Sequence, residues 1–146
     1  MSAKWTLNIA AMQEDFFADT ALIGIASALP AYRLCWILNE YFDINLVREP
    51  ELDVCLQSTA EHQSYFPIYQ YCLPHSEYKH LLYKLKCDKE SLLPEAKQLD
   101  YLWMVQSSSY DTDAQNIIKN LRNIPDIQLA QLLLPEKLKN IAHLLI

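Results

Sequence analysis

Glu95 and Asp100 are carboxylic acids that lie close together in the sequence, and Glu95 directly follows Pro94. Two nearby carboxyl groups can perform acid–base chemistry when burial separates their pKa values. No nucleophile adjoins them, and Glu95 is also explained as an acid in the first turn of a helix that begins at Pro94. One hypothesis keeps them as a site: together with Arg33 they line a pocket for a small molecule or an unrecognised enzyme activity.

Arg33 and Asn39 lie beside the apolar side of a predicted helix. They could offer a guanidinium and an amide to a ligand or a partner protein. The alternative is that they face water or pair with a neighbouring loop.

The densest aromatic segment contains Tyr65, Tyr69 and Tyr71. Tyrosine is enriched where one end of the ring is buried and the other is wet, as in protein interfaces. This segment predicts an interaction surface for a partner protein or for a second copy of the chain. The alternative is a strand whose rings pack on core and surface.

Three histidines and one cysteine are candidate metal ligands: His62, His75, His80 and Cys72. Their spacing matches no known metal motif, and no two of the four cysteines form a C-x-x-C pair. We therefore predict no metal site, and the absence of a disulfide framework or secretory signal favours reduced thiols in the cytoplasm.

The composition disfavours several classes of ligand. Gly24 is the single glycine of 146 residues, so glycine-rich phosphate loops of the Rossmann and P-loop kinds cannot be written, and we predict no nucleotide cofactor. The net charge of −6 opposes binding to nucleic acid and to anionic membranes.

Two segments have helical periodicity. Residues 30–42 place apolar side chains on one side, with Tyr41 or Phe42 at the end of the stripe, and Ser27 is the predicted N-cap. The second predicted helix is capped by Asp111 or Thr112 and has its apolar stripe at Ala114, Ile117, Ile118 and Leu121. It ends before Ile124, because Pro125 disfavours helical conformation at the residue before it.

The other segments alternate or carry β-forming residues, and the ranges predicted as strands are 22–25, 52–57, 65–72, 81–88, 99–106 and 127–133, with a further candidate at 4–10. Pro67 suggests an edge or a bulge. Strands that follow one another without a helix between them favour an antiparallel meander. We therefore predict one α+β domain over residues 1–146, in the order β-α-β-β-β-β-α-β, with residues 1–14 and 140–146 peripheral.

Several short motifs occur in a specific order along residues 15–134. They are Asp15-Phe16 before Leu22-Ile23-Gly24-Ile25, then Tyr32-Arg33-Leu34-Cys35-Trp36, Leu38-Asn39, Leu93-Pro94-Glu95 and Leu99-Asp100-Tyr101-Leu102. This arrangement resembles the bacterial IPExxVD family. The resemblance implies a small cytosolic protein of unknown function and provides no catalytic residues.

Aromatic density on an acidic domain without a catalytic constellation leads to the first hypothesis, a protein-interaction or adaptor module that binds an unidentified protein or its own copy. Nucleic acid and membranes are not expected partners. The small-molecule or enzyme hypothesis stays open beside it.

Overall fold

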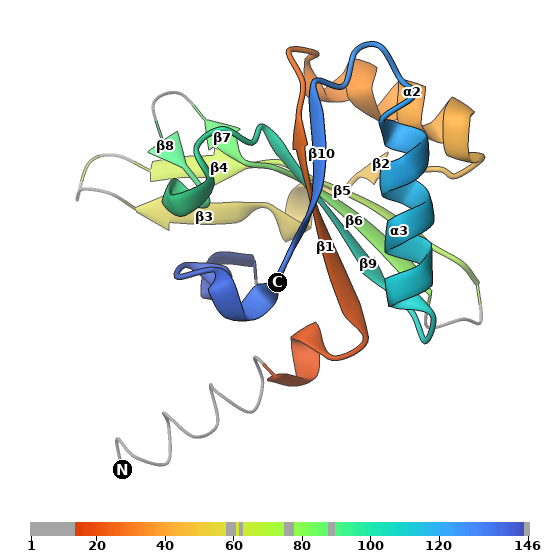
Figure 1. The fold of residues 1–146 in the computed structure, drawn as a ribbon. Coiled ribbons are helices and arrows are strands. Elements are labelled where there is room, and N and C mark those ends of the chain that lie inside the picture. The colour runs from red at the N-terminus through yellow and green to blue at the C-terminus, as the bar shows by residue number, and fades with distance from the viewer. Residues whose placement is uncertain (1–13, 58–60, 62, 75–77, 88–89, 145–146) are drawn as a thin grey trace.

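The computed structural model describes residues 14–57, 61, 63–74, 78–87 and 90–144. These residues form one small α+β domain around a six-stranded sheet with the order β10-β1-β9-β6-β5-β2, in which every neighbouring pair is antiparallel (Figure 1). The predicted fold class is confirmed. The predicted strand at 4–10 lies outside the described residues.

The strands of the large sheet are β1 Thr20–Ala26, β2 Val47–Arg48, β5 Ile68–Cys72, β6 Lys79–Lys84, β9 Tyr101–Gln106 and β10 Leu129–Leu133. Two smaller ladders pair β3 Val54–Gln57 with β4 Gln63–Phe66, and β7 Lys86–Cys87 with β8 Glu90–Ser91. The two long helices are α2 Ala31–Phe42 and α3 Tyr110–Leu121. Residues 14–17 are also helical. The 3₁₀ turns are η1 Pro50–Leu52, η2 Pro94–Ala96, η3 Pro135–Lys137 and η4 Ile141–Leu144.

The two helices cover one face of the sheet (Figure 1). Leu34 and Leu38 of α2 and Ala114 and Leu121 of α3 are fully buried. They pack with Trp103, which points to the helix side of β9 and meets Phe42 edge-on, with ring centroids 5.1 Å apart. This contact attaches the end of α2 to the centre of the sheet.

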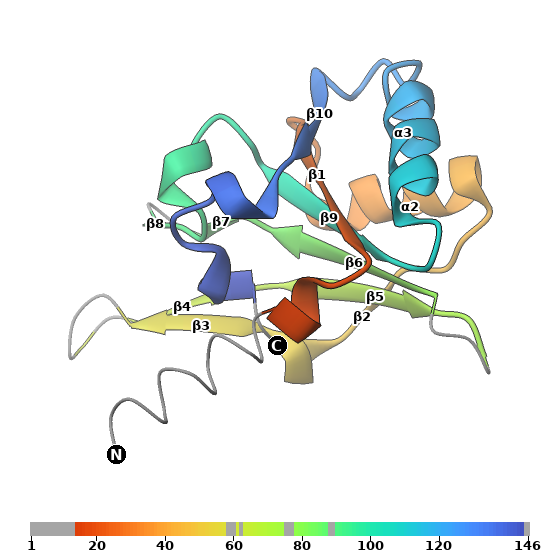
Figure 2. The ribbon, with the colours of Figure 1, turned by 60° about the horizontal axis from the view of Figure 1, so that its bottom comes forward.

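The opposite face is covered by 3₁₀ turns and short strands rather than by long helices (Figure 2). Tyr83 points into this second core, where its hydroxyl donates a hydrogen bond to the Leu144 carbonyl at 2.6 Å. Gly24 also faces this side, and a Cβ there would collide with the Leu99 side chain. The close approach of Leu99 explains why glycine stands inside a central strand.

The predicted capping residues are wrong for both helices. Pro30 occupies the N-cap of α2, while the Ser27 hydroxyl donates to the Asp126 carbonyl at 2.8 Å. The helix α3 begins at Tyr110, so Asp111 lies in its first turn instead of capping it. At α2 a distant hydrogen bond takes the side chain that local sequence rules assign to the cap. At α3 the helix begins before the predicted caps, with Ser109 at the N-cap position.

Two strand predictions also need correction. The segment 65–72 is divided by Pro67 into β4 and β5, which belong to different ladders. In β6, Leu81 and Leu82 are both fully buried, so the half-exposed strand predicted at 81–88 is covered on both faces. Both errors arise because periodicity describes one strand and not the layers that cover it.

Candidate functional site

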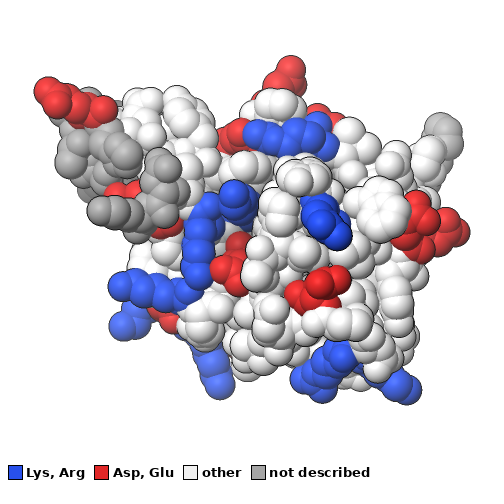
Figure 3. All heavy atoms as spheres, turned by 90° about the horizontal axis from the view of Figure 1, so that it is seen from above, with Lys and Arg blue, Asp and Glu red and all other residues white. Residues whose placement is uncertain are grey.

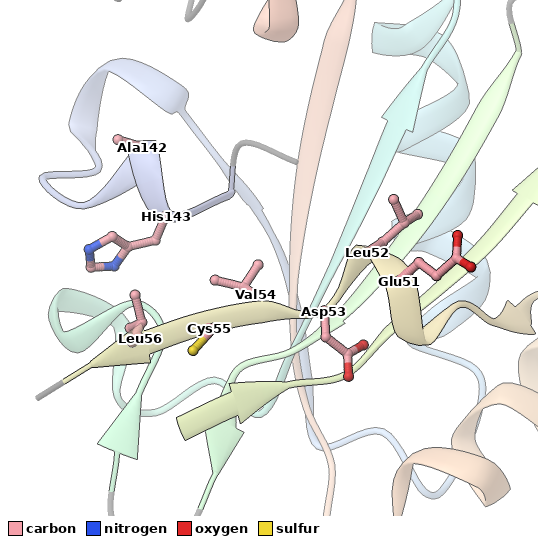
Figure 4. A pocket seen from close by; sticks show the side chains of 8 residues that line it. All are labelled: Glu51, Leu52, Asp53, Val54, Cys55, Leu56, Ala142 and His143. Carbon is pink, nitrogen blue, oxygen red and sulfur yellow. The ribbon is translucent and has the colours of Figure 1, made fainter. Parts of the chain in front are cut away.

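A cavity of about 410 Å³ lies between β3 and the turn η4. Figure 4 shows Val54 and Leu56 directed toward the segment that carries His143, while Cys55 and Asp53 point to the other side of β3. His143 Nδ1 lies 2.9 Å from the Leu92 carbonyl and therefore acts as a donor to it. The titratable groups around this cavity do not converge on one point, so it lacks the arrangement of a catalytic centre.

Asp53, which borders this cavity, has a structural partner. Its carboxylate forms a two-point ion pair with Arg48, in which Nη2 lies 2.7 Å from Oδ2. The hydrogen bonds to Asp53 raise the pKa of Arg48, and the guanidinium also lies over the Tyr69 ring at 5.7 Å. This arrangement joins β2 to the segment before β3.

Asp100, one of the predicted site residues, borders a second cavity of about 320 Å³ beside the start of α2. Its Oδ1 pairs with Lys86 at 2.9 Å, and its Oδ2 accepts a hydrogen bond from the Ser27 amide at 2.9 Å. Tyr101 donates its hydroxyl to the Leu29 carbonyl at 2.7 Å, and burial raises the pKa of Tyr101 to about 12. These contacts fix the segment that leads from β1 into α2.

Glu95 has different partners from Asp100. Its Oε2 accepts the Asn140 amide at 2.6 Å and its Oε1 accepts the Asn140 side chain at 3.1 Å. Burial acts to raise the pKa of Glu95, but hydrogen bonds from its own backbone and from Asn140 lower it. The carboxylate thus connects η2 to the C-terminal segment, while Arg33 lies exposed on α2.

Asn39, the other predicted polar residue of the first helix, fixes the loop that leaves α2. Its Oδ1 accepts the Leu46 amide at 2.7 Å, and its Nδ2 donates to the Leu46 carbonyl at 3.3 Å. The backbone at Asp43 reverses direction with a φ of 54° to allow this return. Asn39 therefore acts on the loop backbone, as its alternative interpretation stated.

His80 is buried beneath the two helices. Trp103 Nε1 donates to its Nδ1 at 2.9 Å, and the Tyr71 ring stacks on it with centroids 5.9 Å apart. Burial lowers the pKa of His80 to about 4, although Asp113 opposes the shift. His62 and His75 lie outside the described residues, and the part of the chain that the structure describes contains no cluster of three metal-ligating side chains.

The three predicted interface tyrosines have different environments. Tyr65 lies on β4 and is 54% exposed, whereas Tyr69 and Tyr71 lie on β5 and pack partly against the core under the helices. Phe66 and Ile68, on either side of Pro67, are both buried on the opposite face of the sheet. The side chains therefore keep the same alternation between the two faces before and after Pro67. Much of the Tyr69 and Tyr71 surface therefore belongs to the fold.

Among the residues that the structure describes, the most exposed aromatic side chains lie on the outer surface of α2. Tyr32 is 72% exposed and Trp36 is 65% exposed, and they follow one another at i and i+4 on one side of the helix. The same surface carries Arg33 in the first turn and Glu40 in the last. These two aromatics were missed as site residues, although they lie opposite the apolar stripe that predicted the helix.

One face of the molecule carries charges of both signs side by side (Figure 3). Lys, Arg, Asp and Glu are scattered with both signs over the face drawn in Figure 3. Within the described residues, no helix is both long enough and apolar enough to cross a membrane.

The comparisons with known proteins add no further constraint. Neither a family model, nor a curated protein, nor a solved structure matches this chain. A role for the outer surface of α2 is therefore inferred from its own side chains.

Proposed function

We propose that this protein is a protein-binding module and that the outer surface of α2, formed by Tyr32, Arg33, Trp36 and Glu40, is its docking surface. One observation supports the proposal: this surface exposes large aromatic rings and also carries charges that are unfavourable for the dipole of its own helix. Such conflicts with local stability are expected where a surface serves binding.

The charges of α2 oppose its dipole. A helix favours acids in its first turn and bases in its last, but α2 has no acid in the first turn and no base in the last. Instead, the base Arg33 lies in the first turn and the acid Glu40 lies in the last. A partner segment with an acid opposite Arg33 and a base opposite Glu40 would neutralise both charges, and its base could also contact the Trp36 ring.

The polar groups that could have supported catalysis are already engaged. Asp100 binds Lys86 and Ser27, Glu95 binds Asn140, and His80 binds Trp103. We therefore prefer a binding function to an enzymatic one. Membership of the IPExxVD family and a cytoplasmic location are part of the same proposal, and the motifs and unpaired cysteines support them.

The experiment is retention of proteins from an extract of the native cell on the immobilised chain. The variants are Trp36→Ala and, as a matched control on the outer side of the neighbouring helix, Asn116→Ala. We expect a protein that is retained by the original chain and by Asn116→Ala, lost from Trp36→Ala, and released as salt concentration rises. Identical retention by the original chain and Trp36→Ala would contradict the proposal.

A further inference from the structure

The charges of α2 match those of an identical helix that runs in the opposite direction. Arg33 and Glu40 are the only charged residues of α2, and both are exposed. In the described part of the chain, neither of them forms an ion pair. They are related as i and i+7, which places them about 10 Å apart along the helix axis. The outer surface of α2 therefore carries one positive and one negative site that the fold leaves uncompensated.

An antiparallel copy reverses the relation of these charges to the helix dipole. Arg33 is unfavourable at the positive end of its own helix, and Glu40 is unfavourable at the negative end. When two copies of α2 lie antiparallel, each Arg33 lies beside the negative end of the other helix and each Glu40 beside the positive end. The charge order that opposes a single helix thus stabilises a pair of helices.

The exposed aromatic side chains lie between the two charges or next to them. Trp36 is close to the midpoint between Arg33 and Glu40, and Tyr32 lies one turn before it. A two-fold axis near Trp36 places Arg33 of each copy opposite Glu40 of the other and brings the two Trp36 rings together. These rings are 65% exposed in a single copy, so their contact removes a large apolar area from water. The surface is complementary to itself, as a two-fold interface requires.

We infer that the partner of the docking surface is a second copy of this chain, bound with α2 antiparallel to α2 across a two-fold axis near Trp36. This rests on the proposed docking surface and names its occupant. The aromatic rings supply most of the affinity, because exposed ion pairs contribute little to it. The two Arg33–Glu40 pairs determine the direction and the register of the helices.

The surroundings of α2 also admit a second copy. The helix lies at the periphery of the domain in both ribbon views (Figures 1 and 2). Asp43, the exposed C-cap residue, falls opposite Pro30 of the other copy in this register. Pro30 lines a cavity together with Lys84, Lys86 and Asp100, so this lining has a net positive charge. The acidic end of each helix therefore meets the basic end of the other.

The size of this surface predicts a weak dimer. The outer side of the twelve-residue helix presents Tyr32, Arg33, Trp36 and Glu40, whereas a standard interface contains about 20–30 residues from each partner. The net charge of −6 on each copy also opposes association. We therefore expect a dimer that dissociates in the micromolar range rather than the nanomolar range.

Sedimentation equilibrium of the full chain, from low to several hundred micromolar, tests this inference. We expect a dimer that Trp36→Ala weakens at least tenfold and that Asn116→Ala, on the exposed side of α3, leaves unchanged. Arg33→Glu places two acids opposite each other at both contacts and should weaken the dimer at least threefold. Circular dichroism of each variant shows that it is folded.

Charge exchange between copies tests the antiparallel register. Glu40→Lys alone also creates like-charged contacts, but a mixture of Arg33→Glu chains with Glu40→Lys chains has opposite charges at both contacts. The double variant Arg33→Glu, Glu40→Lys has opposite charges within one kind of chain. We expect the mixture to associate more tightly than either single variant alone, and the double variant to associate more tightly than Arg33→Glu.

Three results overturn the inference: a chain that stays monomeric throughout, a dimer that persists in Trp36→Ala, or single charge variants that mixing does not rescue. If the chain is monomeric but retains a different protein from the extract through Trp36, the docking surface stands and its occupant is not a second copy. Failure of this inference is thus distinguishable from failure of the proposed function.

Discussion

Helices α2 and α3 both have twelve residues, and both bury one side against the same face of the sheet. Their outer sides follow different rules. α3 presents polar residues, with Asp111 and Asp113 in its first turn and Lys119 in its last, in agreement with the helix dipole. α2 presents Tyr32 and Trp36 and has its charges reversed.

The difference shows that packing against the core does not dictate the outer surface of a helix. Both helices obtain their stability from buried aliphatic residues, so the exposed side is open to other demands. α3 uses it for solubility and dipole compensation. α2 gives up that compensation, and this is the physical basis for assigning the docking surface to α2.

The largest expected effect separates the inner from the outer side of α2. Leu34→Ala removes a fully buried side chain and should lower the free energy of unfolding by about 2–5 kcal/mol. Trp36→Ala removes an exposed ring and should change it by less than about 0.5 kcal/mol. Urea unfolding of the two variants measures both quantities, and a comparable loss from Trp36→Ala would show that Trp36 serves the fold.

The second prediction concerns His80, the polar site beneath the helices. Its pKa is about 4 in the folded chain against 6.5 as the ordinary value, so the unfolded chain binds a proton first as the pH falls. The contribution of His80 to the free energy of unfolding should be complete above pH 6.5 and should be lost as the pH falls from 6.5 to about 4. The size of this contribution is about 3 kcal/mol.

Chemical unfolding of the original chain and of His80→Gln over this pH window measures the effect. Glutamine can still accept a hydrogen bond from Trp103 but does not titrate, so the difference between the two curves isolates His80. Parallel curves from neutral to acidic pH would contradict the assignment. Tyr71, Tyr78, Trp103 and Asp113 surround the ring and are unchanged in this comparison.

The third prediction concerns the end of α2, where Asn39 holds the buried residue Leu46. Asn39→Ala leaves the Leu46 amide without its acceptor and should cost about 1–3 kcal/mol of stability. Asn45 is exposed in the same loop, so Asn45→Ala is the matched control. Equal thermal stability of the two variants would show that the loop does not depend on the Asn39 contacts.

Local periodicity predicted both helices because each helix buries a regular apolar stripe. It predicted the α+β class because the strand residues alternate between the two faces of a sheet. It did not place β1 between β9 and β10, since that order depends on pairing between distant segments. Glu95 and Asp100 were singled out in the sequence as a candidate carboxylate pair. Their partners Asn140 and Lys86 are brought to them by the tertiary fold, which no spacing rule contains.

The docking surface itself was missed for a related reason. Helix prediction from an apolar stripe directs attention to the residues that are buried, and Tyr32 and Trp36 lie on the other side. The signal that was present is an aromatic pair at i and i+4 outside that stripe, next to charges that oppose the dipole.

The smallest expected effect gives the sharpest test of the contrast between the helices. The double variant Arg33→Glu, Glu40→Lys gives α2 the charge order of α3. Because each new charge then agrees with the dipole, stability should rise by about 0.3–1 kcal/mol for each substitution. If these residues serve only the fold, the double variant should be more stable and should still retain the partner protein. If they form the docking surface, the double variant should be more stable but should no longer retain that protein. Thermal unfolding and retention of the Trp36-dependent protein, measured on the same preparation, distinguish the two outcomes.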